Sequence, residues 1–211
     1  MVELRVQIVS GALEPGARIN LDTIASRHGV SRMPVRDAMK QLESEGLVTV
    51  YPRRGVVVAA LDPADIMELY GIRIALERQA MERAVPRLTE ANLQQMRAVL
   101  EKLDTGAGWD KNWAAGNERF HSIIVSRSGW PRLVAMIATL RANVERYINA
   151  HSRLVGTDVA QSQHWMIYEA CRARDVERAK DMVELHLRTS ADDLVSHLAQ
   201  QQPVPVRNGS V

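Results

Sequence analysis

The chain has 211 residues, of which 46% are hydrophobic, 25% charged and 4% aromatic, which excludes disorder as its main state. It lacks any uncharged apolar run of about 18 residues, and its short apolar N-terminal stretch contains charged residues, so we expect no membrane span, no signal peptide and a cytoplasmic protein. Its single cysteine, Cys171, cannot form an internal disulfide, so nitrogen and oxygen ligands would have to hold any metal.

The net charge of +2 is too small, over the whole chain, to indicate a polyanionic partner. Residues 1–60 contain eight Lys or Arg side chains and six acidic ones, whereas residues 61–211 contain nineteen of each. The excess positive charge therefore lies in the first sixty residues, a modest but localised asymmetry.

Three short helices are predicted before residue 46, because apolar residues recur there at three- and four-residue spacing between turn signals. Pro34 suits the first turn of the third helix, where its missing N–H costs nothing. The expected caps and ends are Glu14-Pro15-Gly16, Asn20 or Asp22, His28-Gly29, Ser31 and Glu45-Gly46.

A β-hairpin is predicted next, from two runs of β-branched residues at 47–51 and 56–60. The turn between them carries Arg53 and Arg54 at its tip. Three helices followed by a basic hairpin predict a winged helix-turn-helix, in which the third helix can enter the major groove of DNA.

The remainder is helical in pattern and begins with a cap at Asp62-Pro63. Short connections favour an antiparallel all-α bundle of about six helices. The predicted helices are 63–85, 89–103, 110–127, 131–152, 158–173 and 175–199. We therefore expect a mainly α protein with a DNA-binding domain at 1–60, a helical domain for effector binding and dimerisation at 61–199, and a disordered tail at 200–211.

The candidate DNA contacts are polar side chains of the third helix and of the hairpin tip. Arg32 and Arg36 are four residues apart on one face, which suits guanine edges and phosphates. Any one of these arginines alone fits an ordinary solvated position equally well, but the turn before them and the basic tip after them favour DNA binding. The set is Ser31, Arg32, Arg36, Lys40, Arg53 and Arg54.

A second candidate site consists of three histidines on different predicted helices, His121, His164 and His186. Asn117 lies one turn before His121 and projects from the same face. Three neutral imidazoles in a bundle core would bind a divalent transition metal, with the Asn117 oxygen as a weaker fourth ligand. A histidine considered alone is more often a packing or surface residue.

The stretch GVSRMPVRDAMKQLESEGLVTVYPRRGVVV closely resembles the winged-helix half of GntR-type bacterial transcription regulators. This resemblance implies that Ser31, Arg32 and Arg36 contact the operator and that Gly55 lies at a wing tip that enters the minor groove. Some members carry a basic residue in the second helix where this chain has Asp22, so that contact is not transferred.

Residues 62–199 resemble the helical ligand-binding half of the FCD branch of that family, through NERFH at 117–121, His164 and His-Leu at 186–187. The resemblance implies a divalent metal (Zn, or Ni, Mn or Fe) on Asn117, His121, His164 and His186. Asn117 replaces the usual aspartate and removes one negative charge from the ligand set. The resemblance also implies that Arg73 clamps a carboxylate effector, although Arg73 and Glu77 could instead be a surface pair at i,i+4 spacing.

These features predict a homodimeric, ligand-responsive transcription regulator that binds a palindromic double-stranded operator, most often as a repressor in this family. Two alternatives remain. The metal could be purely structural in a DNA-binding regulator, or the three histidines could form the metal site of an enzyme. No acidic residue lies near the histidines in a spacing that identifies a general base, which disfavours the enzyme.

Overall fold

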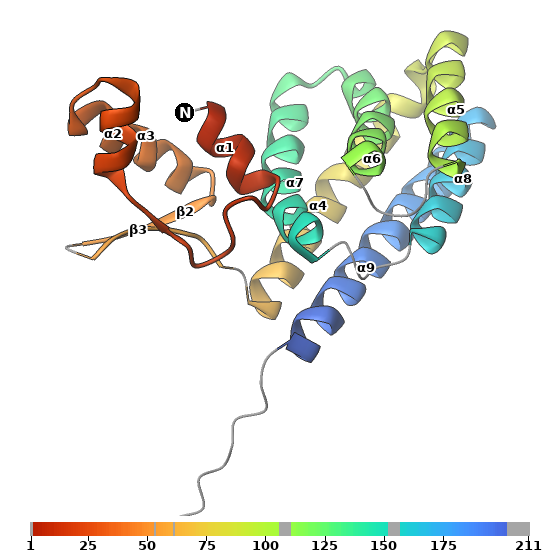
Figure 1. The fold of residues 1–211 in the computed structure, drawn as a ribbon. Coiled ribbons are helices and arrows are strands. Elements are labelled where there is room, and N and C mark those ends of the chain that lie inside the picture. The colour runs from red at the N-terminus through yellow and green to blue at the C-terminus, as the bar shows by residue number, and fades with distance from the viewer. Residues whose placement is uncertain (1, 53, 61, 106–110, 152–156, 202–211) are drawn as a thin grey trace, which may run out of the picture.

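The computed structural model describes residues 2–52, 54–60, 62–105, 111–151 and 157–201 (Figure 1). The chain is mainly helical, with a small sheet in its N-terminal part and a helical bundle after it. Within the described ranges, no helix is both long and apolar enough to cross a membrane.

The N-terminal part is a winged helix-turn-helix. Its elements are α1 (Val2–Val9), β1 (Arg18–Ile19), α2 (Leu21–His28), α3 (Arg32–Ser44), β2 (Val48–Tyr51) and β3 (Gly55–Val58). The three strands are antiparallel in the order β1-β3-β2. The sequence predicted the three helices and the hairpin but not β1, which pairs Arg18 with Val57 and Ile19 with Val56.

The helix ends follow the capping signals of the sequence. The side chain of Asn20 accepts hydrogen bonds from the backbone N–H groups of Asp22 (2.9 Å) and Thr23 (3.1 Å), so Asn20 rather than Asp22 caps α2. Gly29 ends this helix in the left-handed conformation, at φ 62°. The first helix stops at Val9, before the predicted turn at Glu14, because Gly11 adopts a left-handed conformation (φ 73°) and the backbone N–H of Leu13 bonds to the carbonyl of Gln7.

The helical bundle matches the predicted one to within a few residues. It comprises α4 (Pro63–Ala84), α5 (Glu90–Asp104), α6 (Lys111–Val125), α7 (Pro131–His151), α8 (Asp158–Arg172) and α9 (Val176–Gln201), with short 3-10 turns η1 (Val85–Arg87) and η2 (Ser126–Ser128). The helix α9 continues to Gln201, so the first two residues of the predicted tail are helical. The rest of that tail, 202–211, lies outside the described residues.

The winged part and the bundle contain separate clusters of buried hydrophobic residues. The cluster of the winged part includes Ile8, Leu42 and Val58, whereas the larger cluster of the bundle includes Phe120 and Leu100. Between the two parts, α1 packs against α7, as Figure 1 shows.

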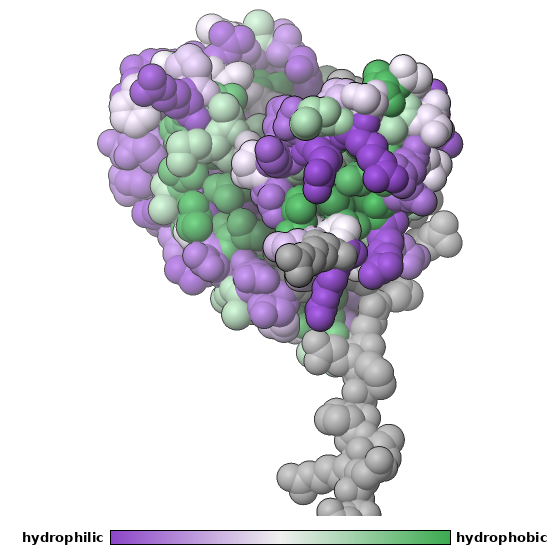
Figure 2. All heavy atoms as spheres, turned by 90° about the vertical axis from the view of Figure 1, so that its left-hand side faces the viewer, coloured by the Kyte–Doolittle hydropathy of each residue, from purple (hydrophilic) through white to green (hydrophobic). Residues whose placement is uncertain are grey.

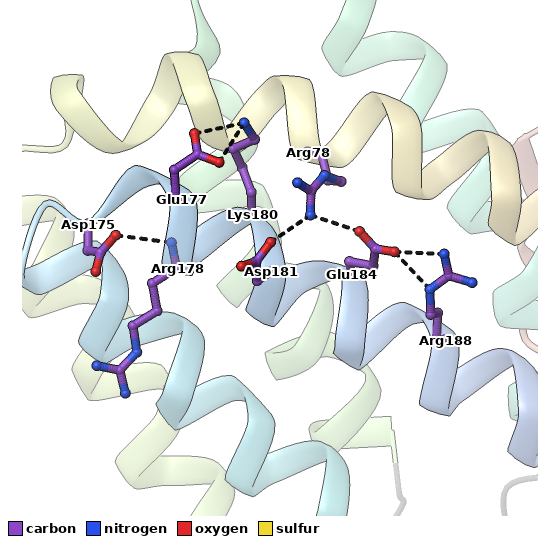
Figure 3. Close-up of polar contacts among 8 residues, drawn as sticks. All are labelled: Arg78, Asp175, Glu177, Arg178, Lys180, Asp181, Glu184 and Arg188. Atoms are coloured by element: carbon purple, nitrogen blue, oxygen red, sulfur yellow. Dashed lines mark hydrogen bonds and ion pairs between the residues drawn. The ribbon is translucent and has the colours of Figure 1, made fainter.

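An ion-pair network joins the two long helices α4 and α9 (Figure 3). The guanidinium of Arg78 on α4 contacts Asp181 at 3.0 Å and Glu184 at 2.8 Å, both on α9. Glu184 also accepts hydrogen bonds from Arg188, one turn further along α9. Because α9 also carries His186, this network helps to fix the helix that presents one of the candidate ligands.

Candidate DNA interface and metal centre

The third helix presents a polar face to solvent and an apolar face to the core. Arg32, Arg36 and Lys40 are exposed, whereas Val35 and Met39 are buried. Hydrophilic side chains cover much of the nearer surface in Figure 2, which looks onto the side from which the hairpin projects. The exposed row can therefore approach another molecule without unfolding the helix.

Ser31 occupies the N-cap position of α3, as the sequence predicted, but its hydroxyl makes no capping hydrogen bond. The first N–H groups of an α-helix have no partner within the helix. An exposed helix N-terminus with such groups, beside Arg32, suits a phosphate oxygen.

The hairpin tip and the start of α3 line one open groove of about 440 Å³. Its lining includes four arginines, Arg18, Arg32, Arg36 and Arg54. Gly55 has φ +97°, which only glycine adopts readily, and this conformation shapes the turn that carries Arg54. Arg53 lies outside the described residues.

Sequence reasoning missed Arg18 as a member of this groove. It lies on β1, a strand of only two residues, which carries no periodicity that could have predicted it. Pairing between Arg18 and Val57 places this arginine beside the hairpin, so the groove combines side chains from β1, α3 and the hairpin.

Two residues of the predicted DNA-binding set contact acidic side chains. Lys40 lies 3.5 Å from Asp37 on the same helix, an exposed pair worth little energy. The guanidinium of Arg32 donates through Nε and one terminal nitrogen to the two carboxylate oxygens of Asp22. This second pair joins α2 to α3 at the edge of the groove.

In the bundle, the structure brings the three predicted histidines together in the core. One ring nitrogen from each of His121, His164 and His186 lies within 4.8 Å of the other two. The Nε2 atoms of His121 and His164 are 3.3 Å apart. Two nitrogen ligands held at about 2.0–2.1 Å from one tetrahedral ion would be roughly 3.3 Å apart, so this pair fits a shared metal.

Two glutamines hold the outer nitrogens of the ligand rings. The Nδ1 of His164 lies 3.3 Å from Oε1 of Gln161, and the Nδ1 of His186 lies 3.1 Å from Oε1 of Gln163. An Nδ1–H that donates to a glutamine oxygen leaves the Nε2 lone pair free for a metal. The sequence offered little sign of these anchors, because glutamine is common on helix surfaces and the Gln163–His186 pair joins two helices.

Burial keeps the three imidazoles neutral. It lowers the pKa of His121 and His164 well below the usual value of histidine, and it lowers the pKa of His186 to about 3. The positive charge of Arg141 lowers all three pKa values further. Neutral imidazole is the form that binds a metal ion, so the site needs no deprotonation at neutral pH.

The predicted fourth ligand also fits a cation. The side-chain oxygen of Asn117 is buried and has no hydrogen-bond partner, and it lies one turn before His121 on α6. A buried amide oxygen without a donor is costly unless something else satisfies it. A donor set of imidazole nitrogens and an amide oxygen suits a divalent transition metal.

Arg73 and Glu77 are not a surface pair, so that alternative is wrong. Their side chains are 8% and 0% exposed, and a terminal nitrogen of Arg73 lies 2.9 Å from Oε1 of Glu77. The other carboxylate oxygen, Oε2, is buried without a partner. Burial is the main reason why the pKa of His186 is lowered, and the positive charge of Arg73 lowers this pKa further. The Arg73–Glu77 pair therefore interacts electrostatically with the histidine cluster.

The sequence matches two known families in succession. Residues 2–58 match the bacterial regulatory proteins of the gntR family, and residues 68–189 match the FCD domain. The chain is 28% identical over 200 residues to the HTH-type transcriptional regulator YdhC of Bacillus subtilis, covering 91% of this chain and 88% of YdhC. It is 26% identical to the HTH-type transcriptional repressor GlaR of Escherichia coli, covering 88% of this chain and 90% of GlaR.

Solved structures give the same fold. McbR/YncC of E. coli superposes with a TM-score of 0.80 at 26% identity, covering 93% of this chain and 95% of McbR/YncC. A metal-free FCD domain superposes with a TM-score of 0.58 at 19% identity, covering 67% of this chain and 99% of that domain. At that identity the second likeness concerns the fold alone.

Proposed function

Because the chain belongs to the GntR family of bacterial regulatory proteins, in the branch with an FCD domain, we propose that it is a ligand-responsive repressor of transcription. The family makes it a DNA-binding transcriptional regulator and not an enzyme. One observation supports the proposal that this regulator responds to a ligand: the same chain contains a basic groove and a buried cluster of three histidines. Its site of action is the cytoplasm, where bacterial DNA lies.

In this proposal residues 1–60 form the DNA-binding domain and residues 61–199 the effector-binding and dimerisation domain. The exposed face of α3 reads base edges in the major groove, and the hairpin contacts the backbone or minor groove. The DNA contacts are Ser31, Arg32, Arg36, Lys40, Arg53, Arg54 and Gly55.

We infer a homodimer on a palindromic operator. A single winged domain buries too little surface on DNA for tight specific binding, because one small module covers only about 600–1,000 Å². A two-fold dimer doubles the contacts when the operator repeats its half-site with the same symmetry.

In the bundle, His121, His164 and His186 would hold a divalent transition metal (Zn, Ni, Mn or Fe), with Asn117 as the fourth protein ligand. The bound ion would supply a positive charge and an open coordination position for an effector oxygen. The chain's own contribution is orientation, because Gln161 and Gln163 fix two of the imidazole rings.

The proposed effector is a small organic acid, and Arg73 is the proposed contact for its carboxylate. The buried position of Arg73 supports this assignment, because a charge-assisted bond is strongest away from water. The guanidinium of Arg73 already donates hydrogen bonds to Glu77. An effector carboxylate would therefore have to share Arg73 with Glu77 or displace Glu77 from it.

The helix α7 is suited to connect the two sites. Arg141 on α7 is close enough to act on the pKa of the three histidines. Two residues further along α7, the side chain of Asn143 lies against Gly46 of the winged part. A Cβ atom added to Gly46 would lie only 3.2 Å from the side-chain nitrogen of Asn143. An effector that binds one arrangement of α7 better than another would shift the population of winged-domain positions.

The test is fluorescence anisotropy of the full chain on duplexes from its own upstream region, with added metal, chelator and a series of mono- and dicarboxylates. We expect strongly salt-dependent binding, because phosphate contacts release counterions, and we expect one acid to weaken it. Binding that is absent or indifferent to salt would refute the regulator's proposed DNA contacts.

A purely structural metal is the second candidate, and the near-complete burial of the three histidines favours it. His121→Ala separates the two roles, with His197→Ala on α9 as the control outside the cluster. If His121→Ala loses the metal and melts at a lower temperature but still responds to the effector, the ion is structural. Loss of the effector response at a temperature where the variant stays folded indicates a regulatory one.

A further inference from the structure

We propose that Asp22 is a specificity-determining residue of the DNA interface, which orients Arg32 for base contact and keeps it from binding phosphates indiscriminately. The inference rests on the proposed DNA-binding role of the groove. It concerns the one acidic residue among the described residues of the groove lining, which include Arg18, Arg32, Arg36 and Arg54.

The side chain of Asp22 contributes only modestly to the fold, as an exposed acidic residue in the first turn of α2. The cap of α2 is Asn20, which already accepts the backbone N–H of Asp22 itself. The side chains of Asp22 and Arg32 are 58% and 71% exposed, and an exposed pair of this kind adds little to stability. A role in binding explains the position of this acid better than a role in folding.

The contact is side-on and leaves one edge of Arg32 free. The two carboxylate oxygens of Asp22 accept from Nε and from one terminal nitrogen of the guanidinium. A guanidinium carries five N–H groups in a fixed plane, so hydrogen atoms on its two terminal nitrogens still point away from Asp22. These are the donors that pair with O6 and N7 of guanine.

Holding Arg32 in this way has two consequences for DNA binding. A side chain that is already oriented loses less rotamer entropy when it binds, so contact with a correctly placed guanine becomes more favourable. The carboxylate also repels phosphate groups and cancels the charge of Arg32, so binding to unrelated sequences becomes weaker. Both effects raise the ratio of specific to non-specific affinity.

The experiment compares the full-length wild type with Asp22→Asn, which keeps the shape and removes the charge. Fluorescence anisotropy on random-sequence duplexes over a salt series measures non-specific affinity, and selection from a random duplex library measures sequence preference. Glu14→Gln is the charge-matched control, because Glu14 is exposed and is not part of the groove lining. Arg32→Ala with and without Asp22→Asn completes a double-mutant cycle.

For Asp22→Asn we expect non-specific affinity to rise roughly threefold to tenfold. We expect the slope of log affinity against log salt to steepen by about 0.9, as for one added phosphate contact. The selected motif should lose definition at one position in each half-site, and Asp22→Asn should cause no further loss of definition in the Arg32→Ala background.

The inference is overturned if Asp22→Asn behaves like Glu14→Gln, or if it changes the selected motif equally in the Arg32→Ala background. Those results still leave the regulator function standing, because wild-type binding to DNA is measured in the same series. Absence of salt-dependent binding by the wild type would instead reject the proposed DNA interface, and the inference with it.

Discussion

Replacing Arg73 with methionine tests whether the buried Arg73–Glu77 pair on α4 stabilises the fold. Methionine keeps much of the length of the side chain and removes its charge. The change would leave Glu77, which is fully buried, with neither carboxylate oxygen bonded to a partner, since Oε2 has none already. Breaking a buried ion pair by removing one partner typically costs about 3–5 kcal/mol.

For a helical part of this size, each kcal/mol shifts the melting temperature by about 2–4 °C, so we expect a decrease on the order of 10 °C. Circular dichroism during thermal unfolding measures it. The double variant Arg73→Met/Glu77→Met should recover most of the loss, because removing both charges leaves no unpaired carboxylate. An unchanged melting temperature in the single variant, or no recovery in the double variant, would refute this reasoning.

Three further predictions follow from the other buried or paired groups. Arg78→Ala should lower the free energy of unfolding by about 1 kcal/mol, and less at high salt, because it removes two contacts between α4 and α9; urea titrations at two ionic strengths measure this. Cys171 is fully buried and burial raises its pKa to about 12, so a disulfide reagent at pH 8 should label it only in urea; rapid labelling of the native protein would contradict this. The unfolded, metal-free chain binds more protons at its histidines than the folded one, because burial lowers their pKa values, to about 3 for His186. Stability should therefore fall as pH decreases below about 6.5, and His186→Gln should reduce that dependence in acid-denaturation curves.

Much of the architecture could be predicted from local signals. Asn20, Gly29 and Asp62 mark helix ends through hydrogen bonds and backbone conformations that involve neighbouring residues only. The spacing of apolar residues similarly located the six helices of the bundle, because an amphipathic helix must bury one face wherever it packs. The candidate histidines were predicted as a group, and the structure places them within one cluster.

Other features depend on contacts between residues far apart in the sequence. The strand β1 exists only because Arg18 and Ile19 pair with β3, nearly forty residues later. The anchoring of His186 by Gln163 similarly joins two helices. Local patterns do not encode such pairings, because the same glutamine or arginine would suit an exposed helix equally well.

The sequence by itself determined the order of elements, the basic character of the first sixty residues and the set of three histidines, since each depends on residue type and short-range spacing. The tertiary structure decided which polar groups are buried and which meet. It showed that Arg73 and Glu77 are enclosed rather than exposed, and that Asp22 meets Arg32 at the edge of the groove. Burial and long-range contacts arise only when the helices pack. Both determine the electrostatic energy of a charged side chain, because that energy depends on the distance to other charges and on exclusion from water.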